Sequence, residues 1–466
     1  MFPSVHPALA DAKPQVFWLD NPSAPAPAPP LTAHEACDLL VIGGGLTGLW
    51  AAVRAKERDP GLAVTLVEGQ AVAHGASGRN GGFCAASLTH GARNGVEHFA
   101  GEISELQRLG RENLTSIAET IRRYGIGCSY EPVGGLTVAT RPHEVPALAD
   151  EAQLLRELGD EVVLLNQDET RAELNSPTYL GGLWETNTVA LVDPARLAWG
   201  LRRVAQALGV RLYEQTPIKR LAPDGAGLLA HSEAGTVAAR HAVLATSAFP
   251  PLLRSIRRYV VPVYDYVLVT EPLSEPQLDA LGWRRRQGAS DSGNQFHYYR
   301  LTADNRILWG GYDAVYHYGN RTGPELEQRD QTATILADNF FTTFPQLEGV
   351  RFTHRWGGAI DTCSRFCVTF GTAHQGRVAY AVGFTGLGVG ASRFGADVAL
   401  DMLLEPESPR LQLQLARKRP RPFPPEPLRW MGIELTRRAL ARADRNGGRR
   451  GPWLRTLDRL GMGFDS

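Results

Sequence analysis

The chain has 466 residues, of which 43% are hydrophobic and 21% charged, as in ordinary globular proteins. Lys plus Arg and Asp plus Glu both number 49, so there is no net charge to attract nucleic acid or a membrane. We expect no transmembrane segment, because no apolar run of about 18 residues occurs. Five cysteines without an N-terminal signal pattern indicate a cytoplasmic protein with free thiols.

The N-terminal residues 1–35 form a leader in which "NPSAPAPAPP" should be extended and stiff. Phe17 and Trp18 either tether this leader to the body or belong to a disordered tail. After the leader, a strand at 38–42, a helix at 46–56 and a second strand at 63–67 are predicted from short apolar runs and helical spacing.

The middle of the chain alternates between two kinds of pattern. Further elements are predicted in chain order: a helix at 96–124, a strand at 134–140, a helix at 144–159, a helix and a strand within 197–218, a strand at 237–249, an antiparallel sheet within 256–315, and a strand, Gly turn and helix within 376–404. This order predicts an α/β protein (α+β overall) in which a dinucleotide-binding unit is interleaved with a sheet-rich unit.

The C-terminal residues 406–466 form an extension rich in Arg and Pro, with one amphipathic helix predicted at 427–444. This extension could be an electrostatic patch for lipid, nucleic acid or a partner. We favour an extension that packs across the body or a neighbouring subunit, because the apolar side chains that it carries need burial. These side chains are Trp430, Leu435, Trp453 and Leu457.

Gly43, Gly45 and Gly48 form a G-x-G-x-x-G turn between the first strand and its helix. The glycines allow a tight turn, close approach of a pyrophosphate and close helix packing, and the helix N-terminus attracts phosphate. Glu68 ends the second strand, where a carboxylate can bind a ribose 2′-hydroxyl and would repel a 2′-phosphate. The pattern predicts dinucleotide binding and does not separate FAD from NAD.

Further motifs carry a resemblance to a known family. "VIGGGLTGL", "GASGRNGG" (75–82), "HAVLATSAF" and "GFTGLGVGASRFGA" (383–396) follow one another in the order found in the D-amino-acid oxidase superfamily. The chain resembles its glycine oxidase, sarcosine oxidase and γ-glutamylputrescine oxidase branch over residues 36–405. The second Gly-rich turn also opens a helix, whose N-terminus suits the electron-rich edge of a reduced flavin. The alternative is that these are two ordinary Gly turns.

The resemblance implies FAD, bound by a Rossmann-like domain with an interleaved antiparallel-sheet substrate domain. We assign 36–95, 190–255 and 355–405 to the FAD-binding domain, and 96–189 and 256–354 to the substrate domain. The residues expected at the cofactor are Gly43, Gly45, Leu46, Thr47, Gly48, Glu68, Gly69, Ala76, Ser77, Arg79, Asn80, Gly81, Gly82, Ile218, Ala245, Thr246, Gly386, Leu387 and Gly388.

The resemblance also implies a reaction. A hydride passes from the carbon next to an amine nitrogen to the flavin, the imine hydrolyses to an aldehyde or keto acid, and dioxygen or another acceptor reoxidises the flavin. A hydroxyl donor, or a flavoprotein docked to a membrane or partner through its basic tail, are the alternatives. No side-chain base is obligatory and no metal is expected. Candidate substrate contacts are His90, Arg93, Tyr264, Tyr266, His297, Tyr299 and Arg300.

Alternation along a strand puts His297 and Tyr299 on one face and Tyr298 and Arg300 on the other, and we expect the first pair to face the flavin. The second Gly-rich turn lacks the lysine of sarcosine oxidases, and the strand before it lacks the Arg-Pro of α-amino acid oxidases. A longer amine is therefore favoured, such as a polyamine derivative or an aminophosphonate bound by arginine. "HRWGGAIDTCSRF" is similar to aminophosphonate oxidoreductases of this superfamily.

Cys363 and Cys367 stand four residues apart. They lack the spacing and neighbouring ligands of a metal site. On one strand they would lie about 13 Å apart, too far for a disulfide. Sarcosine oxidases link FAD to a cysteine in this region, so Cys363 is a candidate covalent link, although two buried thiols lining the flavin site are favoured.

Overall fold

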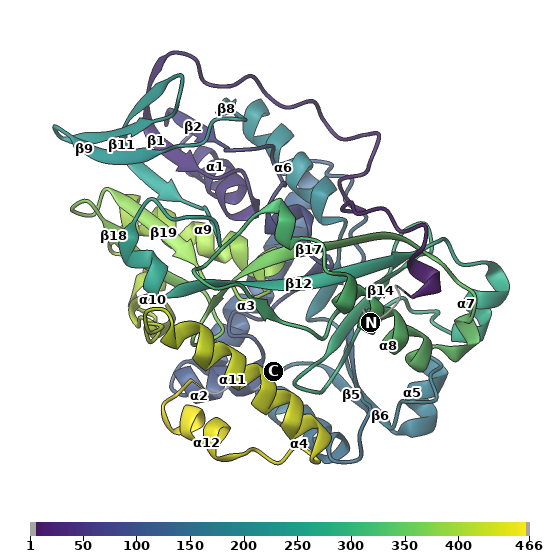
Figure 1. The fold of residues 1–466 in the computed structure, drawn as a ribbon. Coiled ribbons are helices and arrows are strands. Elements are labelled where there is room, and N and C mark those ends of the chain that lie inside the picture. Colours follow the sequence, from purple (N-terminus) through teal and green to yellow (C-terminus); the bar gives the residue numbers. More distant parts are fainter. Residues whose placement is uncertain (1–5, 463–466) are drawn as a thin grey trace.

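The computed structural model describes residues 6–462, which form two sheets with their covering helices (Figure 1). The first sheet is parallel at its centre, in the order β19–β11–β1–β2–β8. Residues 39–42 of β1, all of β2 and all of β19 are buried, as expected of parallel strands covered on both faces. Their bounds are β1 (His34–Ile42), β2 (Val64–Val67), β8 (Arg211–Tyr213), β11 (Thr236–Leu244) and β19 (Val378–Val382), with β18 (Thr369–Ala373), β9 (Arg220–Asp224) and β10 (Gly227–His231) added antiparallel.

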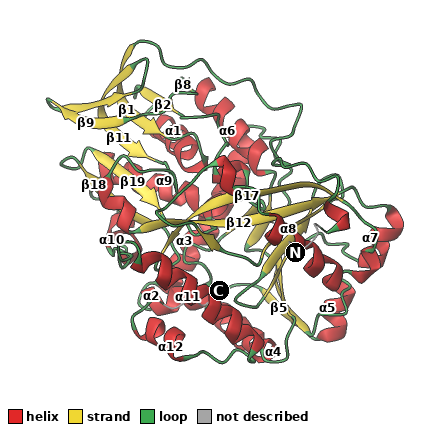
Figure 2. Cartoon of the chain, in the orientation of Figure 1, coloured by secondary structure: helices red, strands yellow, loops and turns green. Residues whose placement is uncertain are grey.

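Helices α1 (Leu46–Arg58), α6 (Pro194–Ala207) and α9 (Gly388–Leu404) pack together against this sheet (Figure 2). The helix expected at 96–124 is two helices, α2 (Ala92–Phe99) and α3 (Ile103–Arg123). The apolar stripe of α3 packs in the same core as α1, although we had assigned this segment to the substrate domain. The stripe consists of Leu114, Ile117 and Ile121, which join Leu49, Trp50 and Val53.

The second sheet has the order β16–β12–β15–β14–β13–β4–β6–β5, with β17 pairing to β12, and is antiparallel except between β13 and β4. Its strands are β4 (Gly135–Ala139), β5 (Val162–Leu165), β6 (Gly181–Glu185), β12 (Val260–Thr270), β13 (Gly288–Asp291), β14 (His297–Leu301), β15 (Ile307–Gly311), β16 (Val315–Tyr316) and β17 (Phe352–Cys363). The antiparallel sheet predicted within 256–315 is confirmed. Because β17 pairs with β12 along its whole length, the predicted domain boundary at 355 cuts through a strand of this sheet.

Helix α8 (Asp330–Thr343) covers one face of the second sheet, and its Phe340 packs against Trp309 of β15. Helices α5 (Gln167–Glu173) and α7 (Glu275–Leu281) lie toward the same end of this sheet (Figure 1). On the opposite face, α4 (Glu144–Glu157) packs on β6. A short pair, β3 (Phe83–Ala85) and β7 (Val189–Leu191), lies where the chain passes between the two sheets.

The leader is a tether. Lys13 donates its backbone N–H to Thr353 of β17 at 2.8 Å, the side chain of Trp18 is buried, and the Ala28 N–H reaches Glu214 at 2.5 Å. Residues 6–33 therefore contact both sheets, which confirms the tether among the two alternatives. Residues 1–5 of the predicted leader lie outside the described range.

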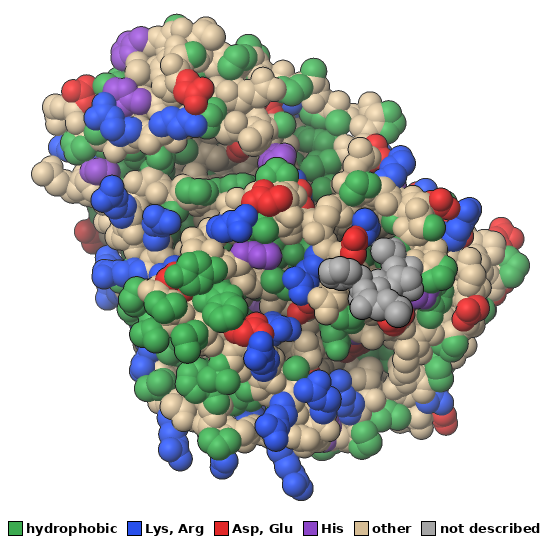
Figure 3. All heavy atoms as spheres, viewed as in Figure 1, with side chains coloured by type: hydrophobic (Ala, Val, Ile, Leu, Met, Phe, Trp, Pro, Cys, Tyr) green, Lys and Arg blue, Asp and Glu red, His purple; other side chains and the backbone are tan. Residues whose placement is uncertain are grey.

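The C-terminal extension packs across the body as expected, through α10 (Gln414–Arg417), α11 (Leu428–Arg445) and α12 (Pro452–Arg459). Asp444 accepts the backbone N–H groups of Asn294 and Gln295, and Leu457 is buried. Two of the side chains expected to be buried are not: Trp430 is 40% exposed and Leu435 47%. Figure 3 shows apolar and basic side chains gathered on the face that α11 forms. No helix within residues 6–462 has both the length and the apolar character to cross a bilayer.

Candidate functional site

The first Gly turn is shaped so that only glycine fits. Gly43 has φ +115°, and a Cβ there would stand 2.4 Å from the carbonyl oxygen of Ala245. A Cβ on Gly48 would stand 1.9 Å from the carbonyl oxygen of Gly43. Gly45 caps α1 without a side-chain hydrogen bond, so the helix begins with its N–H groups directed at the turn. A turn of this shape at a helix N-terminus is suited to hold a phosphate group.

Glu68 follows β2 beside this turn. Its carboxylate accepts the N–H groups of Gly44 at 2.5 Å and Gln70 at 2.8 Å, while burial raises its pKa. The segment that carries Ile218 runs alongside, because Thr216 donates its N–H to the carbonyl of Glu68 at 2.8 Å. The structure thus brings the first turn, Glu68, Gly69, Ile218, Ala245 and Thr246 to the carboxyl ends of the parallel strands, where α/β folds bind ligands.

The loop at 75–82 leads from this turn to the second sheet. Ser77 accepts the N–H of Leu46 at 2.8 Å, so the loop contacts the first turn of α1. Arg79 pairs with Glu327 at 2.6 Å. Asn80 donates to the carbonyls of Ala76 and Ser77 at 2.9 and 3.0 Å. The side chains of Arg79 and Asn80 therefore brace the loop, and its backbone and small residues are what it can offer to a cofactor.

The second Gly turn opens α9 with Gly386, Leu387 and Gly388. Asp361 of β17 fixes this turn by accepting the N–H of Gly383 at 2.7 Å, and burial raises the pKa of Asp361 to about 6. His90 lies beside the turn: it has a hydrogen bond to the backbone of Thr385, and burial lowers its pKa. His90 is thus placed next to a segment predicted to contact the cofactor.

The face of β14 is the opposite of the one we expected. A Cβ on Gly81 would stand 2.7 Å from the ring of Tyr298. Tyr298 is therefore the residue that faces the loop at 75–82, which we call the cofactor loop because its residues are predicted to contact the cofactor. The Tyr299 hydroxyl instead forms a hydrogen bond of 2.6 Å with the Tyr179 hydroxyl, inside the core under α8. His297 lies on that same side, between Asp291 at 2.6 Å and Asn339 at 3.0 Å. The alternation is confirmed, and the choice of face is wrong.

Other predicted substrate contacts also lie away from the loop. The Tyr266 hydroxyl donates to the carbonyl of Leu326 at 2.9 Å, and Tyr264 shares the α8 face. Arg93 is half exposed on α2 and pairs with Glu151 at 3.5 Å. The side chains of Tyr264, Tyr266 and Arg93 therefore have structural partners of their own.

Arg300 of the second sheet does face the cofactor loop, and its side chain contacts residues outside this sheet. Its guanidinium donates to the carbonyls of Val192 at 2.8 Å and Gly82 at 3.4 Å and lies over the ring of Trp18. The residue is 1% exposed, and burial lowers its pKa to about 10. Because its N–H groups bind carbonyl oxygens, Arg300 holds the sheet against the loop.

Asp265 is a residue that sequence reasoning missed. Of the eleven residues of β12, only Val263 and Asp265 are partly exposed, and both lie on the face opposite α8. The Tyr298 hydroxyl donates to the Asp265 carboxylate at 2.5 Å. The available signal was a single acid within the apolar run "VVPVYDYVLV".

The two cysteines do not lie on one strand. Cys363 ends β17, a turn with Phe366 at φ +59° follows, and the chain folds back so that the Cys363 Sγ is 3.1 Å from the Cys367 carbonyl oxygen. Both are free thiols, both are buried, and burial raises their pKa values. No group of three metal-ligating side chains occurs within residues 6–462.

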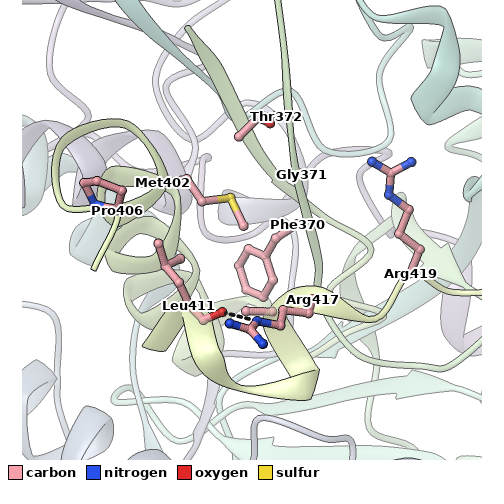
Figure 4. A pocket seen from close by; sticks show the side chains of 9 residues that line it. Phe370, Gly371, Thr372, Met402, Pro406, Leu411, Arg417 and Arg419 are labelled. Carbon is pink, nitrogen blue, oxygen red and sulfur yellow. Dashed lines mark hydrogen bonds between the residues drawn. The ribbon is translucent and has the colours of Figure 1, made fainter. Parts of the chain in front are cut away.

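Two cavities lie outside the predicted cofactor segments or at their edge. The larger, of about 310 Å³, is an open depression between β18, the end of α9 and α10 (Figure 4), and none of the predicted site residues lines it. The smaller, of about 150 Å³, borders Ala85, Ala86 and Ser87 behind the cofactor loop. Its carboxylates already have partners, since Asp160 pairs with Arg111 at 2.6 Å and Glu185 accepts from Thr188 at 2.7 Å.

Comparison with known proteins agrees with this geometry. The model of the FAD dependent oxidoreductase family, DAO, matches residues 38–402. The chain is 28% identical over 404 residues to a probable oxidoreductase, OrdL, of Haemophilus influenzae, covering 83% of this chain and 88% of the relative. It is 30% identical over 385 residues to the γ-glutamylputrescine oxidoreductase of Escherichia coli, covering 81% and 86%.

Among solved structures, glycine oxidase from Geobacillus kaustophilus superposes with a TM-score of 0.67 at 20% identity, covering 80% of this chain and 96% of that chain. The first Gly turn, where a Cβ on Gly43 or Gly48 would collide with a backbone carbonyl oxygen, fits the pyrophosphate of the family's cofactor. The chain therefore belongs to the FAD-dependent oxidoreductase family, and its cofactor is FAD.

Proposed function

We propose that this protein oxidises an amine at the carbon next to the nitrogen, releasing an imine that water converts to an aldehyde or keto acid. The observation that carries the proposal is the 30% identity to γ-glutamylputrescine oxidoreductase over 81% of this chain. When bound, FAD supplies the acceptor for the hydride. The first Gly turn and Glu68 would hold its adenosine diphosphate part, and the loop at 79–83 with the second Gly turn would hold the flavin.

The contacts of the arginines predicted at the site support an amine that carries no free carboxylate or phosphonate next to the nitrogen. Arg79 pairs with Glu327, Arg93 with Glu151, and Arg300 with backbone carbonyls. Each guanidinium is thus already bonded, and the second Gly turn has no lysine. A longer amine of the polyamine type suits this site better than an amino acid or an aminophosphonate.

We also propose an electron acceptor, a location and a role for the C-terminal extension. Dioxygen or another acceptor takes the electrons from the reduced cofactor, and the amine is a small molecule. The five thiols are free, which agrees with a reducing, cytoplasmic location. The contacts of α10 to α12 with the body support a structural extension rather than an electron carrier docked through its tail.

The test is an anaerobic screen of the purified holoenzyme. Diamines, N-acylated diamines, α-amino acids and aminophosphonates are each paired with the alcohol in which a hydroxyl replaces the amine. Loss of flavin absorbance is followed, and the carbonyl product is identified. Bleaching by an amine and not by its matched alcohol is expected, and bleaching by alcohols alone would overturn the proposal. Readmitting air and measuring peroxide then separates an oxidase from a dehydrogenase.

A further inference from the structure

Asp265 occupies an unusual place in the second sheet. It lies in the middle of β12, a central strand, yet its side chain is partly exposed on the face that packs against the cofactor loop. Its cross-strand neighbour on β17 is Gly358, where a Cβ would stand 3.3 Å from the Cβ of Arg79. Asp265 therefore lies where the second sheet closely approaches the loop at 79–83.

The carboxylate is held by neutral donors. The Tyr298 hydroxyl of β14 donates at 2.5 Å and the Tyr266 N–H at 2.8 Å, and Gly311 of β15 adds a backbone N–H. Tyr298 in turn touches Gly81 and meets the ring of Phe83 edge-on at 5.9 Å. The Asp265–Tyr298 pair is thus fixed directly above the segment expected to hold the flavin.

Asp265 lacks an ion-pair partner. Within residues 6–462 no lysine or arginine lies within salt-bridge distance of it. Around it, Arg79 of the loop pairs with Glu327, and His297 of β14 acts on Asp265 only at a distance because it is bonded to Asp291. A partly exposed carboxylate without a cation, beside the loop expected to hold the flavin, is suited to bind a cationic substrate.

We propose that Asp265, positioned by Tyr298, binds the ammonium form of the substrate and takes one of its protons before the hydride leaves. This inference rests on the proposed amine oxidation. In the step, an N–H bond of the ammonium breaks, its electron pair stays on nitrogen, and an O–H bond forms on the Asp265 carboxylate. The carboxyl later loses this proton to water. Asp265 is then the catalytic residue and Tyr298 a positioning residue.

The chemistry requires such a step. An alkylammonium has a pKa near that of lysine, about 10.4, so at pH 7 only about one molecule in 2,500 is neutral. Only the neutral amine has the electron pair that stabilises the forming imine. Burial raises the pKa of Asp265 to about 6, which makes it a stronger base than an ordinary aspartate and leaves it ionised at pH 7.

The first experiment needs no substrate. Visible flavin absorbance of the holoenzyme is titrated from pH 5 to pH 8 in the wild type, Asp265→Asn and Asp291→Asn. Asp291 is the control on the α8 face, where it bonds His297 at 2.6 Å and the Tyr299 hydroxyl at 3.4 Å. Asp361, which fixes the second Gly turn and whose pKa is also raised to about 6, is replaced by Asn in all three proteins so that it contributes no inflection. In this background, an inflection near pH 6 is expected with Asp265 present and in the control, and it should vanish in Asp265→Asn. An inflection that persists in Asp265→Asn overturns the inference.

Tyr298→Phe provides a second test in case Asp265→Asn does not fold. The Tyr298 hydroxyl stabilises the ionised Asp265 carboxylate, so removing this hydroxyl should move the inflection to higher pH. A purely structural tyrosine would leave the midpoint where it was, and that result would contradict the positioning role.

The second experiment uses the amine found in the screen. The rate of anaerobic flavin reduction is measured as a function of pH. At pH 7 this rate should be about 10²- to 10⁴-fold lower in Asp265→Asn than in the wild type. The difference should shrink as the pH approaches the pKa of the free ammonium. Asp291→Asn should retain the wild-type rate and profile. A uniform loss at every pH would overturn the inference. If no amine reduces the wild type, the proposed function itself fails, whatever the titration shows.

Discussion

Trp18 donates its indole N–H to the carbonyl oxygen of Asn80 at 2.8 Å, which joins the leader to the middle of the cofactor loop. Trp356 of β17 donates in the same way to the neighbouring carbonyl of Arg79, at 2.9 Å. Two indoles, one from the leader and one from the second sheet, thus fix the backbone of one loop. The leader therefore supports the loop that we expect to contact the cofactor.

Replacing Trp18 should therefore weaken both the fold and cofactor retention. Trp18 is 4% exposed, and Trp18→Ala should cost about 3–5 kcal/mol of unfolding free energy through the cavity and the lost hydrogen bond. Trp18→Phe should cost about 1–2 kcal/mol, because the Asn80 carbonyl loses its donor. Denaturant unfolding and the ratio of FAD to protein measure both effects. Trp430→Ala, at a 40% exposed position, is the control and should change stability by no more than about 0.5 kcal/mol.

The first Gly turn should not tolerate a methyl group at Gly48. Its Cβ would stand 1.9 Å from the Gly43 carbonyl oxygen, so Gly48→Ala should push α1 away from β1 and cost about 1–3 kcal/mol. FAD content after purification should fall with it. The control is Gly432→Ala in α11, where a Cβ meets nothing within 4 Å. That change should stabilise the protein by about 0.5–1 kcal/mol, and equal effects at both sites would contradict this account of the turn.

FAD should not be linked to Cys363. The thiol is fully buried, its Sγ lies 3.1 Å from the Cys367 carbonyl and 3.5 Å from that of Gly383, and its raised pKa disfavours the thiolate. Acid precipitation of the holoenzyme should leave a yellow supernatant and a colourless pellet. A yellow pellet that becomes colourless in Cys363→Ser would establish the link instead.

Asp361 should make stability fall as the pH rises. Burial raises the pKa of this 4% exposed carboxyl from its ordinary value of 3.8 to about 6, so folding favours its protonated form. The stabilisation is complete below about pH 4 and is lost as the pH rises through 6, about 3 kcal/mol in all. Relative to Asp361→Asn, the wild type should lose melting temperature between about pH 4 and pH 6.5. The control variant is Asp150→Asn, at an exposed position of α4. The pH dependence of its melting temperature should differ less from that of the wild type than the pH dependence of Asp361→Asn does.

Arg365 should decide whether the C-terminal extension stays attached. Its buried guanidinium donates to the carbonyls of Lys418 and Leu415 in the extension and of Val368 in β17's following loop. Arg365→Ala leaves several buried carbonyls without donors, at about 1–3 kcal/mol each. Limited trypsin digestion should then release the extension faster than from the wild type. Arg442→Ala, at an exposed position of α11, should leave the release rate unchanged.

The elements that were predicted correctly depend on neighbours along the chain. The strand, Gly turn and helix around Gly43 to Gly48 could be predicted because glycine spacing and an apolar run are local properties. The same holds for β19 and α9, and for α11, whose observed start at 428 is one residue from the predicted one. The helix expected at 96–124 was interrupted at 100–102, where Gly101 separates α2 from α3.

Only the tertiary structure decided which face of a strand is covered and which residues pair across neighbouring strands. Alternation on β14 is symmetric, so the sequence could not tell whether Tyr298 or Tyr299 meets the cofactor loop, and the choice followed from α8 burying Tyr299. The Asp265–Tyr298 pair joins residues 33 positions apart across strands of one sheet, which no local pattern reveals. The sequence by itself determined the dinucleotide turn and the family. The arrangement around it depends on long-range packing, because burial of one face of a strand is a property of whatever covers it.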